Sequence, residues 1–298
     1  MKKQLLCVMS LAFVLSGCSQ AQTSIQNATE EIMTINGTTY TRNDEYNFQK
    51  KSNGPSGTVQ LALKHIYSEE IGIDDSIREE AKKQVQESID SVEDFESQVQ
   101  TLGYKDIQDY TEKVAIPSIQ SERLLEKYLK DNKKAIQEKL DPSMAQIIEC
   151  ANEENAKQAL AALKEGTDLQ TIVNSYGVEG SAYTGVSQFI NSNNYDLPTR
   201  LVNLLSTSKK TGVIDEVFFN ESNDSPKYFV AVLESNDYDK NIKKYAHALK
   251  EDQAFNEDCL IFYLDKYKFE IHDQDIFNYF KANKPAYLVN RPDLMENK

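Results

Sequence analysis

Apolar and polar positions along the chain predict three blocks of different character. In the first block, about residues 32–140, two short β-patterns at 32–36 and 39–41 flank Asn36-Gly37, a pair typical of a tight hairpin turn. Apolar residues then recur every three or four positions, which predicts helices. The block is therefore expected to open with a strand pair and to continue as a helical region.

Turn and capping residues divide the helical part of this block. Ser76 and Glu79 form a capping box ahead of an apolar stripe over residues 77–92. Gly103 ends the next short helix, and Pro117 interrupts the helical period that follows, after which a charged helix resumes. These stripes are predicted to face a core, and we assign them no chemistry.

The second block begins after Asp141-Pro142 and alternates strand and helix signals. Residues 145–150 are apolar and strand-like, and Asn152 is placed to cap a helix that ends before Gly166. The pattern continues with a helix at 169–176, a loop rich in Gly, Ser and Asn, a helix near 198–208, and strands at 213–219 and 228–233 joined by a turn at 221–226. This order predicts a compact α+β domain.

From Asp239 the pattern is helical again, and it ends with a short strand-like segment at 269–272 and a last helix near 275–280. Because the first and third blocks share a helical character, one helical domain interrupted by an insert explains the pattern best. We predict an α+β protein with a discontinuous helical domain at 31–141 and 236–298 and an inserted domain at 142–235.

The N-terminus carries the pattern of a bacterial lipoprotein signal. Lys2 and Lys3 precede an apolar run at 5–14, which is followed by Leu15-Ser16-Gly17-Cys18. The run is shorter than the roughly 20 apolar residues that a membrane-spanning helix needs. We therefore predict a signal peptide at 1–17, lipidation of Cys18 and a flexible tether at 18–30. Function is then expected at the outer face of the cytoplasmic membrane.

The 298 residues carry a formal net charge of −14, or about −16 without the two lysines of the signal, which argues against nucleic-acid binding. No glycine-rich phosphate-binding loop occurs. Cys150 and Cys259 remain beyond the signal; two separate buried thiols is the simpler interpretation, and their pairing stays open. Because His65, His247 and His272 are isolated, the sequence predicts neither a metal site nor a cofactor.

Several short motifs, taken in order, resemble those of PrsA-type foldase lipoproteins. The resemblance covers nearly the whole chain after the signal, with a SurA-like helical chaperone domain and an inserted parvulin-like domain. The motifs lie at 32–48, Ala145-Gln146-Ile147-Ile148, Thr184-Gly185-Val186-Ser187, Leu197-Pro198, 210–214 and 228–233. This resemblance implies an insert of order β-α-α-α-β-β with an antiparallel sheet.

The insert departs from the family pattern where catalysis would occur. Active parvulins resemble one another in a histidine on the first strand, a histidine on the last strand, and Asp or Cys after paired glycines; here these positions are Gln146, Phe229 and Val186. The positions of the apolar prolyl pocket fall at Asp196, Leu197 and Arg200. All three histidines lie outside the insert, so no shift of alignment restores the pair. We therefore expect very low or absent isomerase activity and no catalytic residue, although Gln146 could still donate a hydrogen bond.

The resemblance implies a chaperone that binds unfolded or partly folded secreted polypeptides after translocation and is held by its lipid anchor at the cell membrane of a Gram-positive bacterium. In this family the helical domain supplies a cradle and often dimerises, which leaves a monomer and a homodimer open here. Two alternatives remain: an active parvulin-type peptidyl-prolyl isomerase of the same fold, and a solute-binding or adhesive surface lipoprotein. No two-lobe α/β pattern and no repeat favours the latter.

Overall fold

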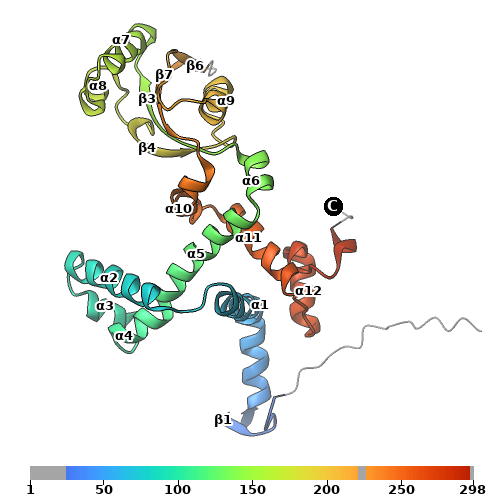
Figure 1. Cartoon of the computed structure of the whole chain (residues 1–298). Helices are drawn as coiled ribbons and strands as arrows, with labels where there is room; N and C mark the ends of the chain where they lie inside the picture. The colour runs from blue at the N-terminus through green and yellow to red at the C-terminus, as the bar shows by residue number, and fades with distance from the viewer. Residues whose placement is uncertain (1–24, 221–225, 296–298) are drawn as a thin grey trace, which may run out of the picture. The chain divides into compact units, whose positions relative to one another are not determined.

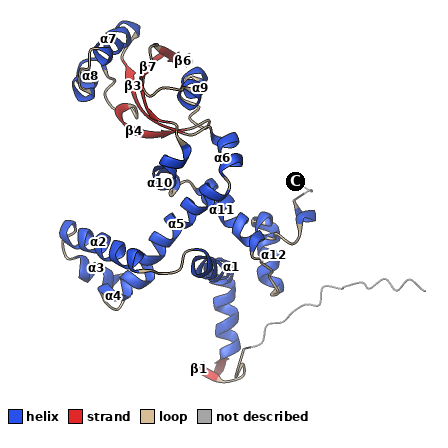
Figure 2. Ribbon diagram, viewed as in Figure 1, coloured by secondary structure: helices blue, strands red, loops and turns tan. Residues whose placement is uncertain are grey.

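The computed structural model describes residues 25–220 and 226–295, which have the predicted α+β character (Figure 1, Figure 2). The signal at 1–17, Cys18, most of the tether and residues 221–225 lie outside the described residues. The chain splits into two compact units, residues 1–65 with 261–298 and residues 66–260. The boundaries fall inside helices α1 (Arg42–Glu70) and α11 (Gln253–Lys266). The predicted domain boundaries near 141 and 235 do not coincide with them and stay a prediction.

The first unit opens with a hairpin. Strand β1 (Glu31–Ile35) pairs antiparallel with β2 (Thr38–Thr41). At the turn, φ is 48° for Asn36 and 81° for Gly37, the left-handed conformations that a two-residue hairpin turn requires. The predicted strand pair is confirmed, and every side chain of β1 is exposed.

Helix α12 (Gln274–Asn283) is joined to α1 by a nearly buried ion pair. Lys50 Nζ of α1 lies 2.7 Å from Asp275 Oδ2 and 3.3 Å from Asp273 Oδ2. The side chain of Lys50 is 14% exposed and that of Asp273 is 8% exposed. Asp273 also caps α12, because its carboxylate accepts the backbone N–H groups of Asp275 and Ile276. Two short 3₁₀ turns, η2 (Pro285–Tyr287) and η3 (Pro292–Leu294), follow α12.

The strand expected at 269–272 does not form, and this prediction is wrong. Helix α11 ends in a cap in which Lys268 adopts φ 52° and the Phe269 N–H bonds to the carbonyl of Leu264 at 2.9 Å. The following residues connect this cap to Asp273, which is the N-terminal capping residue of α12. Alternating apolar residues alone do not make a strand, because a strand needs a partner for its backbone groups.

Replacing Lys50 with Met is expected to lower the free energy of unfolding by about 1–3 kcal/mol, because the nearly buried carboxylate of Asp273 would lose its contact with the Lys50 ammonium. Lys51→Met, which removes an exposed lysine of the same helix, should change the free energy by less than about 0.5 kcal/mol. Urea unfolding of both variants gives the comparison. Equal effects would show that the pair does not stabilise this unit.

The second unit contains a layer of helices around α5. These helices are α2 (Asp75–Ser91), α3 (Phe95–Thr101), α4 (Ile107–Tyr110), α5 (Ile116–Asp131), α6 (Lys133–Leu140) and α10 (Tyr238–Leu249). The buried side chains of Ile77 and Ala81 from α2 pack in one cluster with Ile116 and Ile119 from α5. The predicted apolar stripe of α2 therefore faces a core.

Two helix ends differ from the prediction. Asp74 caps α2 in place of the Ser76 and Glu79 box, since its Oδ1 accepts the Ile77 N–H at 2.9 Å. Pro117 does not interrupt a helix but is the second residue of α5, directly after a π-helical turn, η1 (Thr111–Ala115). The wider π turn accommodates the proline ring and the missing N–H.

An antiparallel sheet follows α6 in the sequence. Its strands are β3 (Ser143–Cys150), β4 (Thr184–Ile190), β5 (Gly212–Val213), β6 (Phe218–Asn220) and β7 (Lys227–Ser235). Among the described residues the order is β4-β3-β7, and both β5 and β6 pair with the other edge of β7. Helices α7 (Glu153–Lys164) and α8 (Leu169–Tyr176) cover one face of the sheet, and α9 (Thr199–Thr207) covers the other (Figure 1).

Most predicted elements of this region are confirmed. Asn152 caps α7 by accepting the Asn155 N–H at 2.8 Å, and Gly166 follows the helix with φ 82°. The segment read as a Gly, Ser and Asn loop contains β4, whose start at Thr184 agrees with the motif resemblance. The strand expected at 213–219 forms only at its two ends, as β5 and β6. β4 forms although its sequence has a weak strand propensity, because the neighbouring strand β3 supplies hydrogen-bond partners for its backbone.

Candidate functional site

The two strand positions singled out by the sequence, Gln146 and Phe229, do not meet. In the pairing of β3 with β7, Gln146 lies opposite Val232, and Phe229 lies opposite Glu149. Directly opposed residues share a face of a sheet, and successive residues of a strand alternate faces. Gln146 and Phe229 are therefore on opposite faces, and the structure brings no pair of these side chains together.

Phe229 lies on the α9 face and belongs to the core there. Phe229 and Ile147 are 0% exposed, and Leu197 is 3% exposed. The ring of Tyr183 meets the Phe229 ring edge to face, with the centroids 5.7 Å apart. Because protein cores are close-packed, a prolyl ring cannot enter beside Phe229 without displacing these side chains.

Val186 lies in an irregular part of β4. The register between β3 and β4 shifts between Gln146 and Ile148, and Gly185 adopts φ 73° in this bulge. Val186 is 56% exposed and carries no group that could donate or accept a hydrogen bond. Of the three catalytic positions of the family pattern, Val186 is thus exposed to solvent, Phe229 is in the core on the α9 face, and Gln146 is on the opposite face.

The three pocket positions have structural partners. Asp196 Oδ2 accepts the Tyr183 hydroxyl at 2.7 Å, and burial together with this carboxylate raises the pKa of Tyr183. Leu197 is buried in the same core. The exposed Arg200 forms a bidentate pair with Glu216, at 2.7 Å and 2.8 Å, and its guanidinium lowers the pKa of Glu216. Asp196 and Leu197 therefore close the α9 face, and Arg200 stays outside it.

A polar cluster that the sequence analysis missed lies opposite Phe229. Glu149 is 7% exposed, and its Oε2 accepts the Ser181 hydroxyl at 2.7 Å. Lys227 Nζ, at the start of β7, lies 3.2 Å from Glu149 Oε1. The one acidic residue of strand β3 was the available signal, because a buried carboxylate needs partners. The cluster ties the loop before β4 to the sheet and holds its carboxylate in an ion pair.

Glu149→Gln is expected to reduce the free energy of unfolding by about 1–2 kcal/mol, since the amide keeps the Ser181 contact and loses the pair with the half-exposed Lys227. Glu179→Gln, at an exposed carboxylate in the same region, is the matched control and should be neutral. The two variants are compared by urea unfolding. A neutral Glu149→Gln would mean that the cluster does not fasten the loop.

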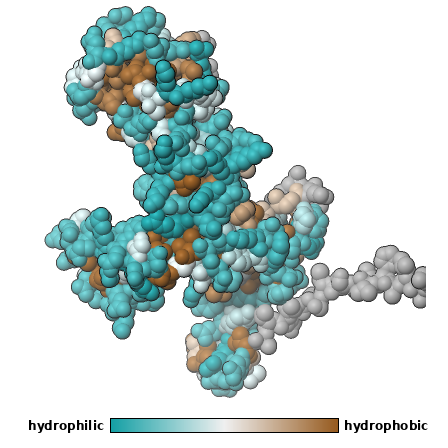
Figure 3. Space-filling model, in the orientation of Figure 1, coloured by the Kyte–Doolittle hydropathy of each residue, from teal (hydrophilic) through white to brown (hydrophobic). Residues whose placement is uncertain are grey.

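Several large apolar side chains of the first unit are exposed. On the hairpin Met33 is 49% and Ile35 is 60% exposed, and on α1 Phe48 is 68% and Leu61 is 71% exposed. Figure 3 shows hydrophobic surface over the hairpin. Met33 and Ile35 lie on the same face of β1. Exposed apolar residues grouped in this way are typical of interaction sites rather than of a solvated face.

The described residues offer little redox or metal chemistry. Cys150 and Cys259 are free and buried, as the simpler interpretation predicted, and burial raises the pKa of each thiol to about 12. Within residues 25–220 and 226–295, no group of three His, Cys, Asp or Glu side chains is arranged to hold a metal ion. In the same ranges, none of the helices has the length and apolar character to cross a membrane.

Solved structures of other proteins are similar to this chain. A Bacillus cereus peptidylprolyl isomerase, PrsA, is 16% identical with a TM-score of 0.46, and covers 87% of this chain and 100% of its own. The foldase PrsA of Streptococcus pneumoniae is 18% identical with a TM-score of 0.39, over 86% of this chain and 99% of its own. PrsA of Bacillus subtilis is 17% identical with a TM-score of 0.38, over 84% of this chain and 99% of its own.

The chain is similar to solved PrsA structures. This similarity agrees with the resemblance predicted from the motifs. No protein-family model matches the sequence, and no curated protein matches it.

Proposed function

We propose that the chain is a membrane-tethered, extracytoplasmic foldase that holds secreted polypeptides after translocation and does not catalyse prolyl isomerisation. The lipoprotein pattern ending at Cys18 supports the location. The helical blocks, the sheet insert and the motif order support the foldase class. Clients are unfolded or partly folded polypeptides, and homodimerisation stays a prediction.

One observation carries the holding function. The first unit exposes apolar side chains on two adjoining elements, the hairpin and α1, among them Ile35, Phe48 and Leu61. A chaperone that works without a nucleotide must bind its clients reversibly, and an exposed apolar surface supplies such binding because an unfolded client exposes apolar residues of its own.

The α9 face of the sheet supports the absence of isomerase activity. Rotation about a prolyl bond meets a barrier of about 18–20 kcal/mol, which an isomerase lowers by stabilising the twisted amide. Losing one preorganised polar group typically costs about 10²–10³-fold in rate. Here the family positions are a core phenylalanine, Phe229, an exposed Val186, and Gln146 on the other face.

A double variant, Phe48→Ser with Leu61→Ser, is expected to weaken suppression of aggregation of a reduced secreted protein by about threefold or more, because it removes exposed apolar area without touching a core. Leu102→Ser, at a residue of the second unit that is also 71% exposed, is the control and should act like wild type. Light scattering during aggregation gives the readout. If the wild-type chain does not suppress aggregation, the holding function is wrong, and a solute-binding or adhesive role gains weight.

The wild-type chain is expected to leave the isomerisation rate of a short prolyl peptide at its uncatalysed value in a protease-coupled assay, since Gln146 and Phe229 lie on opposite faces of the sheet and cannot act together on one prolyl bond. An active parvulin measured beside it verifies that the assay responds. Clear catalysis by this chain would favour the alternative of an active isomerase.

A further inference from the structure

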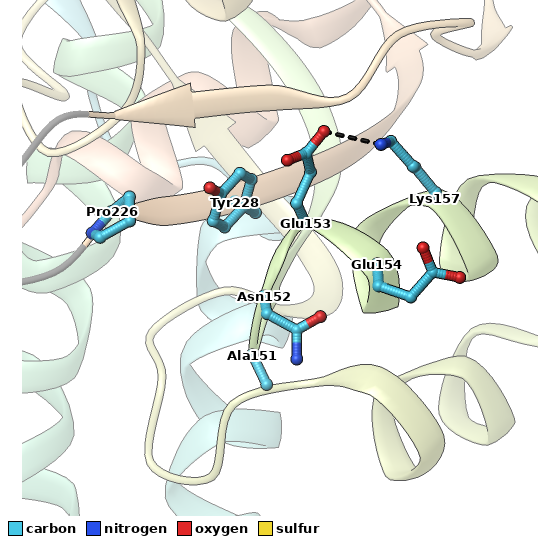
Figure 4. A pocket seen from close by; sticks show the side chains of 7 residues that line it. All are labelled: Ala151, Asn152, Glu153, Glu154, Lys157, Pro226 and Tyr228. Carbon is cyan, nitrogen blue, oxygen red and sulfur yellow. Dashed lines mark ion pairs between the residues drawn. The ribbon is translucent and has the colours of Figure 1, made fainter.

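A cavity of about 640 Å³ lies at the start of α7, away from the α9 face. Figure 4 shows that its walls are the first turn of α7 on one side and the beginning of β7 on the other. Tyr228 and Pro226 contribute apolar surface from β7 and the residue before it. The volume falls in the range of about 300–1,000 Å³ that small ligands and peptide side chains occupy.

Tyr228, which lines this cavity, has an aromatic neighbour, Phe219, outside the lining. Phe219 of β6 lies directly opposite Tyr228 of β7, and their ring centroids are 6.5 Å apart with planes inclined by 36°. Phe219 is 56% exposed. The two tilted rings on neighbouring strands place apolar surface beside the cavity, which suits an aliphatic, prolyl or aromatic side chain of an extended peptide.

Carboxylates form the opposite wall. Glu153 pairs with Lys157 at 2.7 Å, and both side chains are more than half exposed, so the pair is weak (Figure 4). Glu154 accepts a hydrogen bond from Gln158 at 3.0 Å and, among the described residues, has no ion pair. The cavity thus keeps an excess of negative charge in a chain whose formal net charge is −14.

An anionic ligand does not fit this wall. The N-terminus of α7 would attract an anion, but Asn152 already caps it by accepting the Asn155 N–H, and Glu153 and Glu154 occupy its first turn. These carboxylates instead favour a cation beside the aromatic surface, where the ring faces add attraction for lysine or arginine.

We propose that this cavity binds an extended client segment in which an apolar side chain neighbours a basic one. The apolar side chain lies on Phe219 and Tyr228, and the lysine or arginine pairs with Glu154. The inference rests on the proposed holding function, and it names the class of client sequence that the sheet domain selects. It needs no isomerase chemistry, since the cavity is separate from the α9 face.

The test uses the full chain and three fluorescent peptides of equal length, one alternating Leu and Arg, one alternating Leu and Glu, and one alternating Ser and Arg. Anisotropy titrations should give at least about tenfold tighter binding of the Leu–Arg peptide than of either other peptide. Phe219→Ser and Glu154→Lys should each weaken Leu–Arg binding by about fivefold or more. Tyr195→Ser and Glu165→Lys, at exposed residues outside the cavity, should leave binding unchanged.

The outcomes separate this proposal from the holding function. The cavity proposal is overturned if all three peptides bind equally, or if the cavity variants bind like the controls. The holding function remains supported in that case if the wild-type chain still suppresses aggregation. If the wild-type chain does not suppress aggregation but still prefers the Leu–Arg peptide, the holding function is overturned and the cavity proposal stands. Because Phe219 lies in a strand, circular dichroism checks that variant, and the exposed Glu154→Lys variant tests the proposal independently.

Discussion

The antiparallel register between β3 and β7 fixes which side chains share a face of the sheet, and the chemistry of the second unit depends on it. With Phe229 opposite Glu149, the α9 face receives Phe229 and Ile147, and Gln146 turns to the other face. A shift of one residue would exchange the two sets. The burial of the apolar set against α9, with Leu201 at 0% exposure, holds this register in place.

The same register places one carboxylate on an apolar face. Glu149 would be costly there without partners, and Lys227 and Ser181 supply them from two other segments. Tyr183 is fastened in a similar way to Asp196. Packing and ion pairing therefore occupy the place where the family pattern has catalytic groups, and the sheet domain is closed on that side.

A sheet domain that is closed on its α9 face still offers binding surface elsewhere. Phe219 is exposed beside the partly buried Tyr228, and the first unit exposes apolar residues on the hairpin and α1. Under the proposed holding function, both surfaces would suit clients that are transiently unfolded, because neither requires a defined tertiary structure in its partner. The proposed binding without turnover would need no nucleotide, and the sequence contains no glycine-rich phosphate-binding loop.

Local structure could be predicted from the sequence where it depends only on neighbouring residues. Examples are the Asn36-Gly37 turn, the Asn152 cap and the helix at 169–176. The strand expected at 269–272 failed, since strand formation requires a distant partner. Tertiary structure alone decided that Gln146 and Phe229 lie apart, because the face on which a strand residue lies is set by pairing register between segments some eighty residues apart, and that register depends on the packing of the whole domain.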